Sequence, residues 1–375
     1  MESLLTKFKE YLPDYRVSSL NNLLLLTLCI LDGGTVNLYK LRGRVAKFIA
    51  KPIAADSGYK RLIRVFDKHA HSRLWLSLLQ CVFRLLRLQS KYLILDGTSW
   101  KHQGVKYHYL TLSIIYRSVA IPIYWVDLSK LGISSFKERK QMFKRLFKHF
   151  NLKGKILLAD REYIGKEWFN FLINNGLLFI IRLRKKNYQS YVNQTPGKSY
   201  QQLIDKVLRS KLADKAVGKP IEIDGVSYTF VVTKYLDTKG KAHLLLLLGS
   251  LNHHPKAIAD AYLKRWKIEC CFRHLKSNGF DLEQLNLKGK ARGKLLMAVM
   301  VFAYVISIHE GLKTYKNVRE IQRSNGPLEK AESVFRHGYD NLIAKVDSLV
   351  KLVQYIITEI QNAINKYQSA NWLVV

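Results

Sequence analysis

The stretch Tyr92-Leu93-Ile94-Leu95-Asp96-Gly97-Thr98-Ser99 joins an apolar run of strand length to an acid and a turn-forming glycine. A second stretch has the same form, because Asp160 directly follows the apolar run that ends Lys155–Ala159. An acid at the carboxyl end of a buried strand lies at the rim of the sheet, where open α/β folds bind their ligands. Either aspartate alone could be a turn former or a helix cap. Together they predict a polar site at the rim of one sheet.

The segments around these acids follow the order strand, strand, strand, helix, strand, helix, strand. After the Asp96 strand, this order rests on strands at Tyr107–Tyr116, Ala120–Val126, Lys155–Ala159 and Leu178–Ile181, and on helices at Phe136–Phe150 and about Lys166–Asn175. A three-strand meander that continues into alternating helices and strands predicts an α/β fold. Between about 185 and 242, glycines and prolines punctuate short pieces, which predicts a small β-rich insertion.

Four polar residues share one face of a predicted helix further along the chain. At about 100° per residue they fall within roughly a 60° arc. They are Tyr262, Arg265, Glu269 and Lys276. The opposite face is apolar and would seat the helix on a core, with Ile268, Cys271 and Leu275. In this grouping the carboxylate can bind a metal ion, while the phenol, the guanidinium and the ammonium can bind a phosphodiester beside it. A basic amphipathic helix is the alternative.

These three segments resemble the motifs of the cut-and-paste transposases of bacterial insertion sequences, in the family numbered four. The hallmark of that family, Tyr-x2-Arg-x3-Glu-x6-Lys, matches at every spacing, and Leu93–Thr98 and Leu157–Glu162 look like its first two motifs. The resemblance runs from about residue 59 to about residue 336, and it is strong in the motifs and loose between them. It implies a ribonuclease-H-like catalytic core with three catalytic acids, Asp96, Asp160 and Glu269.

The same three acids are the expected metal ligands. Convergent carboxylates repel one another and raise their own pKa values unless a cation lies among them. Hard oxygen ligands beside phosphate suit Mg²⁺ or Mn²⁺, and two ions per site are expected. The resemblance implies cleavage at the inverted-repeat ends of a transposon, followed by strand transfer into target DNA. A metal-dependent nuclease or resolvase on the same fold is the alternative. The intact triad disfavours a third class, a noncatalytic DNA-binding relic.

Residue types also suggest which side chains contact DNA. Arg265 offers a bidentate fork to phosphate, Lys276 a point charge, and Tyr262 a neutral donor. Arg161 and Arg182 are further candidates for the DNA backbone. The tryptophan after Arg265, Trp266, would either stack on a displaced base or pack under the sheet, and packing is slightly favoured.

Better-known relatives form a hairpin at the transposon end and hold a flipped base on a tryptophan of the insertion. The matching stretch here, Lys241–Leu245, contains no tryptophan. This departure leaves two interpretations open. Either the hairpin step is absent, or the stacking role falls to His243 or to a nearby tyrosine such as Tyr235.

The composition agrees with a polyanionic partner. The chain has 62 Lys and Arg against 28 Asp and Glu, a formal net charge of +34, which suits double-stranded DNA. No signal peptide is visible, and the longest apolar runs considered, near Leu23–Leu31 and Leu244–Leu248, fall short of the ~20 residues of a spanning helix. A cytoplasmic, nucleoid-associated bacterial protein is therefore expected. The four cysteines show no zinc spacing and are expected to be buried and reduced.

Three regions are predicted. Residues 1–90 read as a basic helical domain that binds transposon ends. Residues 91–290 read as the catalytic core, interrupted by the insertion at about 185–242. Residues 291–375 read as helical, with helices at Leu295–Leu312 and Leu342–Tyr367. For the second of these, core packing is favoured over a dimer contact. A homodimer is expected in the synaptic complex.

Overall fold

The computed structural model describes residues 2–49, 52–86, 90–102, 104–128, 130, 132–236, 241–250, 252–322 and 328–366. Contacts divide the chain into two compact units. Unit 1 contains Met1–Leu88, Trp100–Tyr107 and Cys271–Ala370, and unit 2 contains Gln89–Ser99, His108–Cys270 and Asn371–Val375.

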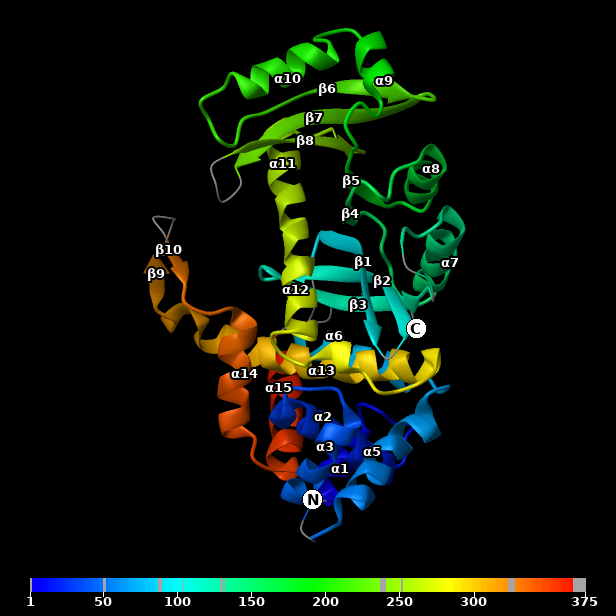
Figure 1. The fold of residues 1–375 in the computed structure, drawn as a ribbon, viewed down its shortest axis with the longest axis vertical. Helices are drawn as coiled ribbons and strands as arrows, with labels where there is room; N and C mark the ends of the chain where they lie inside the picture. Colours follow the sequence, from blue (N-terminus) through cyan, green and yellow to red (C-terminus); the bar gives the residue numbers. More distant parts are fainter. Residues whose placement is uncertain are drawn as a thin grey trace. The chain divides into compact units, whose positions relative to one another are not determined.

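Unit 2 is built on a sheet with the strand order β3-β2-β1-β4-β5-β8-β7-β6 (Figure 1). The strands are β1 (Tyr92–His102), β2 (Val105–Tyr116), β3 (Val119–Asp127), β4 (Ile156–Ala159), β5 (Leu178–Arg182), β6 (Ala216–Ile223), β7 (Val226–Leu236) and β8 (Ala242–Gly249). β2 and β3 are antiparallel, whereas β4 runs parallel to both β1 and β5. The order of the first five strands and these directions are those of a ribonuclease-H-like core, which confirms the predicted fold class.

The central strands are apolar because both faces of the sheet are covered. All four residues of β4 are buried, as expected for a parallel strand between helical layers. Helices α7 (Phe136–Leu146) and α8 (Lys166–Asn174) pack against each other and, respectively, against β3 and β5. α7 begins with a capping box in which the Ser135 side chain accepts from the Glu138 backbone amide, so its start is fixed locally.

The prediction that the first strand ends at Asp96 was wrong. β1 continues to His102, and only its parallel pairing with β4 stops at Leu95 and Ala159. Gly97 lies where a Cβ atom would be 2.7 Å from Nε2 of buried His108 on β2. The glycine therefore permits close approach inside the sheet at this point instead of making a turn.

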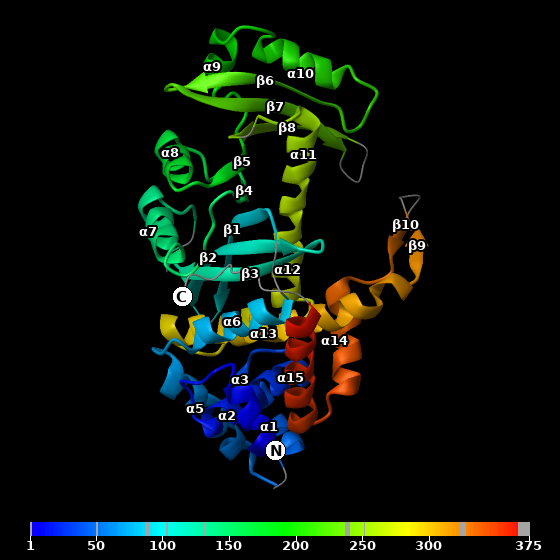
Figure 2. The same ribbon diagram turned by 180° about the vertical axis from the view of Figure 1, so that it is seen from behind.

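The insertion contains two helices that were not predicted, α9 (Gln189–Gln194) and α10 (Tyr200–Leu208). They lie on one side of β6–β8, and α11 (Pro255–Leu263) lies on the other (Figures 1 and 2). The sequence had predicted a β-rich insertion, but Ser199 starts α10 with a capping box and Leu203, Ile204 and Val207 bury its inner face. Residues 237–240 of the predicted insertion lie outside the described part of the chain.

The signature stretch is not one continuous α-helix. α11 is followed by a 3₁₀ turn, η2 (Lys264–Trp266), and then by α12 (Lys267–Lys276). The tighter turn changes the angle per residue, so the predicted arc holds only approximately. The apolar face was predicted correctly, since Ile268, Cys271 and Leu275 are buried.

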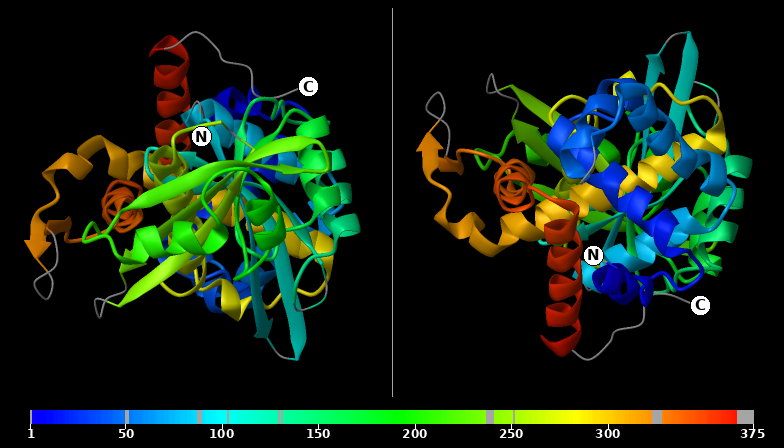
Figure 3. Two further views of the ribbon diagram at one scale, coloured as in Figure 1. Left: turned by 90° about the horizontal axis from the view of Figure 1, so that it is seen from above. Right: turned by 90° about the horizontal axis from the view of Figure 1, so that it is seen from below.

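Unit 1 is mainly helical. Its helices are α1 (Glu2–Lys9), α2 (Val17–Gly33), α3 (Leu38–Leu41), η1 (Arg42–Arg44), α4 (Val45–Phe48), α5 (Ala55–His69), α6 (Leu74–Leu86), the end of α12, η3 (Leu282–Gln284), α13 (Lys290–Thr314), η4 (Tyr315–Asn317), α14 (Val334–Lys345) and α15 (Leu349–Lys366). α13 runs alongside the N-terminal helices and packs on α2, α5, α6 and α14 (Figures 1 and 3). A short antiparallel pair, β9 (Glu320–Gln322) and β10 (Leu328–Lys330), comes between α13 and α14 in the sequence and projects away from both helices (Figure 2).

Close packing of α13 on α14 depends on glycine. A Cβ atom on Gly338 would lie 1.9 Å from the carbonyl oxygen of Ser307, and one on Gly311 would lie 2.2 Å from that of Val334. Both positions therefore admit only a residue without a side chain.

Two predictions for this unit were wrong: that the apolar runs fall short of a membrane-spanning helix, and that one helix covers Leu342–Tyr367. α13 belongs to a stretch, Lys290–Asn317, that is long and apolar enough to cross a membrane, yet 89% of its most apolar window is buried in the fold, as in a core helix. The predicted helix Leu342–Tyr367 is instead the end of α14 and the whole of α15, and Tyr367 lies outside the described residues. The apolar face of α15 is buried, as core packing predicted: Leu349, Leu352, Val353, Ile356, Ile357 and Ile360.

Candidate active site

The two predicted aspartates are neighbours in unit 2. β1 and β4 run parallel with Leu95 opposite Ala159, so Asp96 and Asp160 follow at the same level on adjacent strands. Neighbouring strands lie about 4.8 Å apart. The sheet register therefore places both residues side by side where the pairing of β1 with β4 ends, although 64 sequence positions separate them.

Arg265 connects the third acid to the first. Its Nη1 lies 3.0 Å from Oδ2 of Asp96, and its Nη2 lies 2.6 Å from Oε1 of Glu269. Only 12% of the Arg265 side chain is exposed, so this fork lies largely out of solvent. One guanidinium thus holds two carboxylates from distant parts of the chain.

Asp160 has its own partners in unit 2. The phenol of Tyr262 donates to Oδ1 of Asp160 at 3.5 Å, and Nη1 of Arg182 lies 3.9 Å from the same oxygen. Two signature residues, Tyr262 and Arg265, therefore contact the first two acids. Arg182 enters from the end of β5, the strand next to β4.

The electrostatics reflect a carboxylate cluster with too little positive charge. Burial raises the pKa of Asp96 to about 7, and the charges of Glu162 and Asp160 add to the rise, although Arg265 and the Gly97 amide oppose it. Burial also raises the pKa of Tyr262, which stays a neutral donor. Burial acts to lower the pKa of Arg265, but the charges of Asp96 and Asp160 and the hydrogen bond to Glu269 raise it above its ordinary value.

The three acids have the oxygen atoms that a hard divalent cation prefers, but the described side chains are not grouped around one point as metal ligands would be. Within the described ranges, no three His, Cys, Asp or Glu side chains are grouped closely enough to hold one metal ion. Instead, the Arg265 guanidinium supplies positive charge between Asp96 and Glu269. All three acids offer oxygen ligands of the kind that Mg²⁺ and Mn²⁺ prefer. A metal ion bound to Asp96 and Glu269 would have to share or displace that contact.

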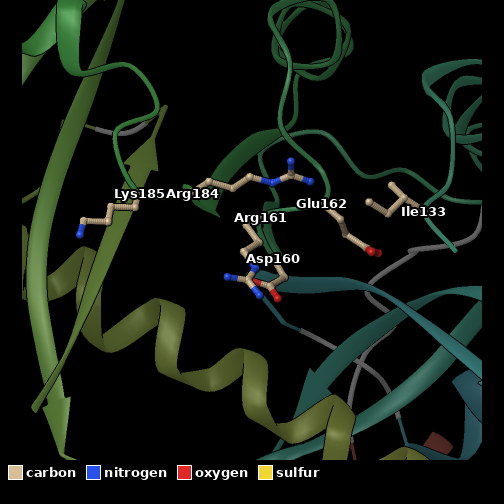
Figure 4. Close-up of a pocket in the computed structure, with 6 residues that line it drawn as sticks. All are labelled: Ile133, Asp160, Arg161, Glu162, Arg184 and Lys185. Atoms are coloured by element: carbon tan, nitrogen blue, oxygen red, sulfur yellow. The ribbon is translucent and has the colours of Figure 1, made fainter.

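A pocket of about 590 Å³ opens beside Asp160 (Figure 4). It is lined by Ile133, Asp160, Arg161, Glu162, Arg184 and Lys185. In Figure 4, Glu162 extends toward Ile133, and Arg184 reaches in from the segment after β5. Sequence reasoning assigned no role to Glu162. The signal was available, since a second acid stands two residues after Asp160.

Two other predicted site residues lie differently from the acids. Trp266 is 54% exposed, so the expectation that it packs under the sheet was wrong. On an ideal helix Trp266 lies about 40° from Tyr262 and away from the apolar face of Ile268, Cys271 and Leu275, which agrees with this exposure. Lys276, at the end of α12, belongs to unit 1, where its Nζ lies 3.5 Å from Oε1 of Glu283 and 5.6 Å from the Trp100 ring centroid.

Tyr235 and His243 form a cross-strand aromatic pair on β7 and β8. Their rings are stacked, with centroids 5.3 Å apart and planes 20° apart, and Tyr235 is partly exposed to solvent. No disulfide joins the four cysteines, all of which lie in the described residues; Cys29, Cys81 and Cys271 are buried as expected, whereas Cys270 is only half-buried.

The ribonuclease-H-like core and the acid cluster define a nuclease-type DNA enzyme, and comparison with known proteins gives the family. A model described as "Transposase DDE domain" matches residues 87–306, more than half of the chain. The chain belongs to this family of DDE transposases. Its members are metal-dependent enzymes that cleave and join phosphodiester bonds in DNA, so the predicted enzyme class is confirmed.

No curated protein matches the chain significantly. Among solved structures, it is similar to the piggyBac transposase in a synaptic complex with hairpin DNA. The identity is 12%, the TM-score is 0.49, and the match covers 95% of this chain and 78% of that one.

Proposed function

We propose that the chain is a cut-and-paste transposase of the insertion-sequence family numbered four, which cleaves DNA at inverted-repeat ends and transfers the freed strands into target DNA. The observation that carries the proposal is the Arg265 fork. It joins Asp96 of the first motif to Glu269 of the third, 3.0 Å and 2.6 Å away. A chain with the signature spacing but an unrelated fold would have no reason to bring these motifs together.

Within this function, Asp96, Asp160 and Glu269 are the catalytic acids and hold the metal, Mg²⁺ or Mn²⁺, with two ions per site. Bound divalent ions supply charge stabilisation to the attacking and leaving oxygens of the phosphodiester. The chain's own contribution is to place three carboxylates on a rigid sheet and helix and to keep Arg265 between two of them.

The DNA contacts proposed for the site are phosphate contacts and one stacking contact. Arg265, Tyr262, Arg161 and Arg182 lie near the acids in unit 2, and their donors suit phosphate oxygens. Lys276 would add a point charge from the end of α12. Trp266 is exposed and suits stacking on a base.

The larger assignments are also proposals. The basic helical region 1–90 would bind the transposon ends, with exposed cations such as Lys40, Lys60 and Arg64 on α3 and α5. The core would span 91–290 with its insertion at about 185–242, and 291–375 would pack and contribute to a homodimer on paired ends. The protein would act in a bacterial cytoplasm at the nucleoid.

The hairpin step is proposed with a changed base-stacking residue. Tyr235 and His243 already form an aromatic stack on β7 and β8, and such a surface suits a displaced base. This pair would replace the tryptophan that Lys241–Leu245 does not contain.

The deciding experiment uses a labelled duplex that carries the element's own inverted-repeat end, incubated with Mg²⁺ or Ca²⁺ and run on a denaturing gel. A Mg²⁺-dependent nick followed by a slow-migrating hairpin supports the full proposal. A double-strand break without a hairpin retains the transposase and removes the hairpin step. Cleavage without joining to a supercoiled target plasmid would favour the nuclease or resolvase, and tight binding without cleavage would contradict the proposal.

A further inference from the structure

A buried arginine lies beneath the turn that carries the second acid. Arg139 of α7 is only 5% exposed. Its Nη1 donates to the carbonyl oxygens of Ser134 and Glu162, both at 3.2 Å. Its guanidinium carbon lies 5.7 Å from the Tyr163 ring centroid and 5.3 Å from that of Trp168. One side chain therefore connects α7, the turn Asp160–Tyr163 and α8.

This arginine is costly to bury. The acid one residue before it, Glu138, pairs with Lys130 at 2.7 Å, and the Nε of Arg139 is buried without an acceptor. Burial lowers the pKa of Arg139, although the acidic groups of Tyr163, Glu162 and Glu138 act in the opposite direction. An apolar side chain of similar volume would avoid the desolvation of a charge. The contacts that an apolar residue could not make are the hydrogen bonds to the Ser134 and Glu162 carbonyls, and the second of these lies in the turn after Asp160.

Apart from the Arg139 hydrogen bond, two contacts of Tyr163 hold the backbone of this turn. The Tyr163 amide donates to the Asp160 carbonyl at 3.0 Å, and the Tyr163 ring is fully buried against Arg139. Above this anchor, Asp160 and Glu162 line the pocket together with Arg161. Arg139 therefore supports, from the core side, the backbone whose side chains face the site.

We propose that Arg139 is a positioning residue: it holds the Asp160–Tyr163 turn so that the carboxylates of Asp160 and Glu162 face the pocket. It touches neither of these carboxylates and acts through the Glu162 carbonyl and the Tyr163 ring. The inference rests on the proposed function in so far as Asp160 is taken as a catalytic acid.

The first test measures the turn directly and does not depend on activity. Hydrogen exchange is compared in the wild type, Arg139→Met, Arg139→Lys and Met142→Ala, the last removing buried core volume from the same helix. Loss of the hydrogen bond should speed exchange of the Tyr163 amide about tenfold in Arg139→Met, with α8 and β5 unchanged. Arg139→Lys should restore part of the protection, and it tests the same contact if Arg139→Met does not fold. Met142→Ala should lower the melting temperature without this local effect.

Wild-type protection of the Tyr163 amide in Arg139→Met would overturn the proposal. So would an increase spread over all of unit 2, as for the core variant, because that pattern indicates a purely structural role.

The second test links the turn to the site. In the complex with end DNA, Arg139→Met should raise the half-saturating Mn²⁺ concentration by about 10- to 100-fold, measured by electron paramagnetic resonance, with DNA affinity unchanged. An unchanged Mn²⁺ affinity in a folded variant with a loosened turn would contradict positioning of Asp160. If the wild type neither cleaves nor binds Mn²⁺, the proposed function fails, whereas the exchange experiment still decides whether Arg139 holds the turn.

Discussion

Arg265 and Asp96 are 169 positions apart in sequence, and their side chains lie 3.0 Å apart as a partly buried ion pair. The same guanidinium binds Glu269 one helical turn further on. This contact joins the middle of strand β1 to the helix that carries the third acid. It also places positive charge where a divalent cation would otherwise neutralise the carboxylates, so Arg265 and the proposed metal ion would act on the same two groups.

Glu269→Gln should abolish cleavage and leave end binding intact. The amide removes one negative charge and one anionic oxygen ligand, and the loss should exceed the ~100-fold typical of residues that only support a metal ligand. The measurement is single-turnover nicking of the labelled end with Mg²⁺, beside a binding isotherm. The control is Glu167→Gln on α8, which should cleave normally. Undiminished nicking by Glu269→Gln would remove Glu269 from the catalytic acids.

Arg265→Ala should weaken phosphate binding and make the salt dependence of end binding shallower by about one phosphate. It also leaves Asp96 without its only close ion-pair partner in the described part of the chain, so added Mg²⁺ should raise the melting temperature more than in the wild type. Arg265→Lys should keep the salt slope and lose the fork to Asp96 and Glu269. The readouts are binding from 50 to 200 mM salt, a range over which such slopes are resolved, and thermal shift with Mg²⁺. An unchanged slope in Arg265→Ala would take Arg265 out of the DNA interface.

Trp266→Ala should change folding stability by less than about 0.5 kcal/mol, because the side chain is more than half exposed. If the ring stacks on a base, affinity for end DNA should fall by about 1–3 kcal/mol. Trp266→Phe should recover part of that affinity. Urea unfolding and fluorescence anisotropy measure the two effects. A large loss of stability with normal DNA binding would restore the packing interpretation.

Acid should destabilise unit 1 through Glu359. His309 and Lys313 lie 2.8 Å and 2.7 Å from its carboxylate, and the hydrogen bond from His309, with that from Lys313, lowers the pKa of Glu359 from 4.5 to about 2. A pKa lowered by folding adds stability that is present above about 4.5 and is lost as the pH falls toward 2.

Glu359→Gln should therefore lower the free energy of unfolding at pH 7 by on the order of 1–3 kcal/mol. Its stability should also fall less steeply than that of the wild type below about pH 4.5. Denaturant unfolding at a series of pH values gives both quantities. Glu329→Gln, at an exposed position on β10, is the control, and identical acid slopes in Glu359→Gln and the wild type would show that the network adds no stability.

Local sequence patterns predicted the strands of the core correctly. Apolar runs predicted the strands and their order along the chain, because a buried parallel strand such as β4 must be apolar throughout. The two unpredicted helices α9 and α10 lie in largely polar sequence, where α10 depends on its capping box and both helices depend on packing against the strands of the insertion. Trp266 was misjudged because packing was favoured for a large aromatic ring that lies on the polar side of the helix, away from Ile268, Cys271 and Leu275.

The sequence by itself determined the three motifs, their residue types and the spacing from Tyr262 to Lys276, because these are properties of one chain read in order. It also determined the excess of positive charge. Only the tertiary structure decided that Arg265 lies between Asp96 and Glu269, that Glu162 faces the same pocket as Asp160, and that Arg139 supports their turn from below. The Arg265 and Arg139 contacts depend on strand register and on the packing of helices from distant segments, and neither leaves a local signal in the sequence. The spacing of Asp160 and Glu162 is visible in the sequence, but the fold decides that both line one pocket.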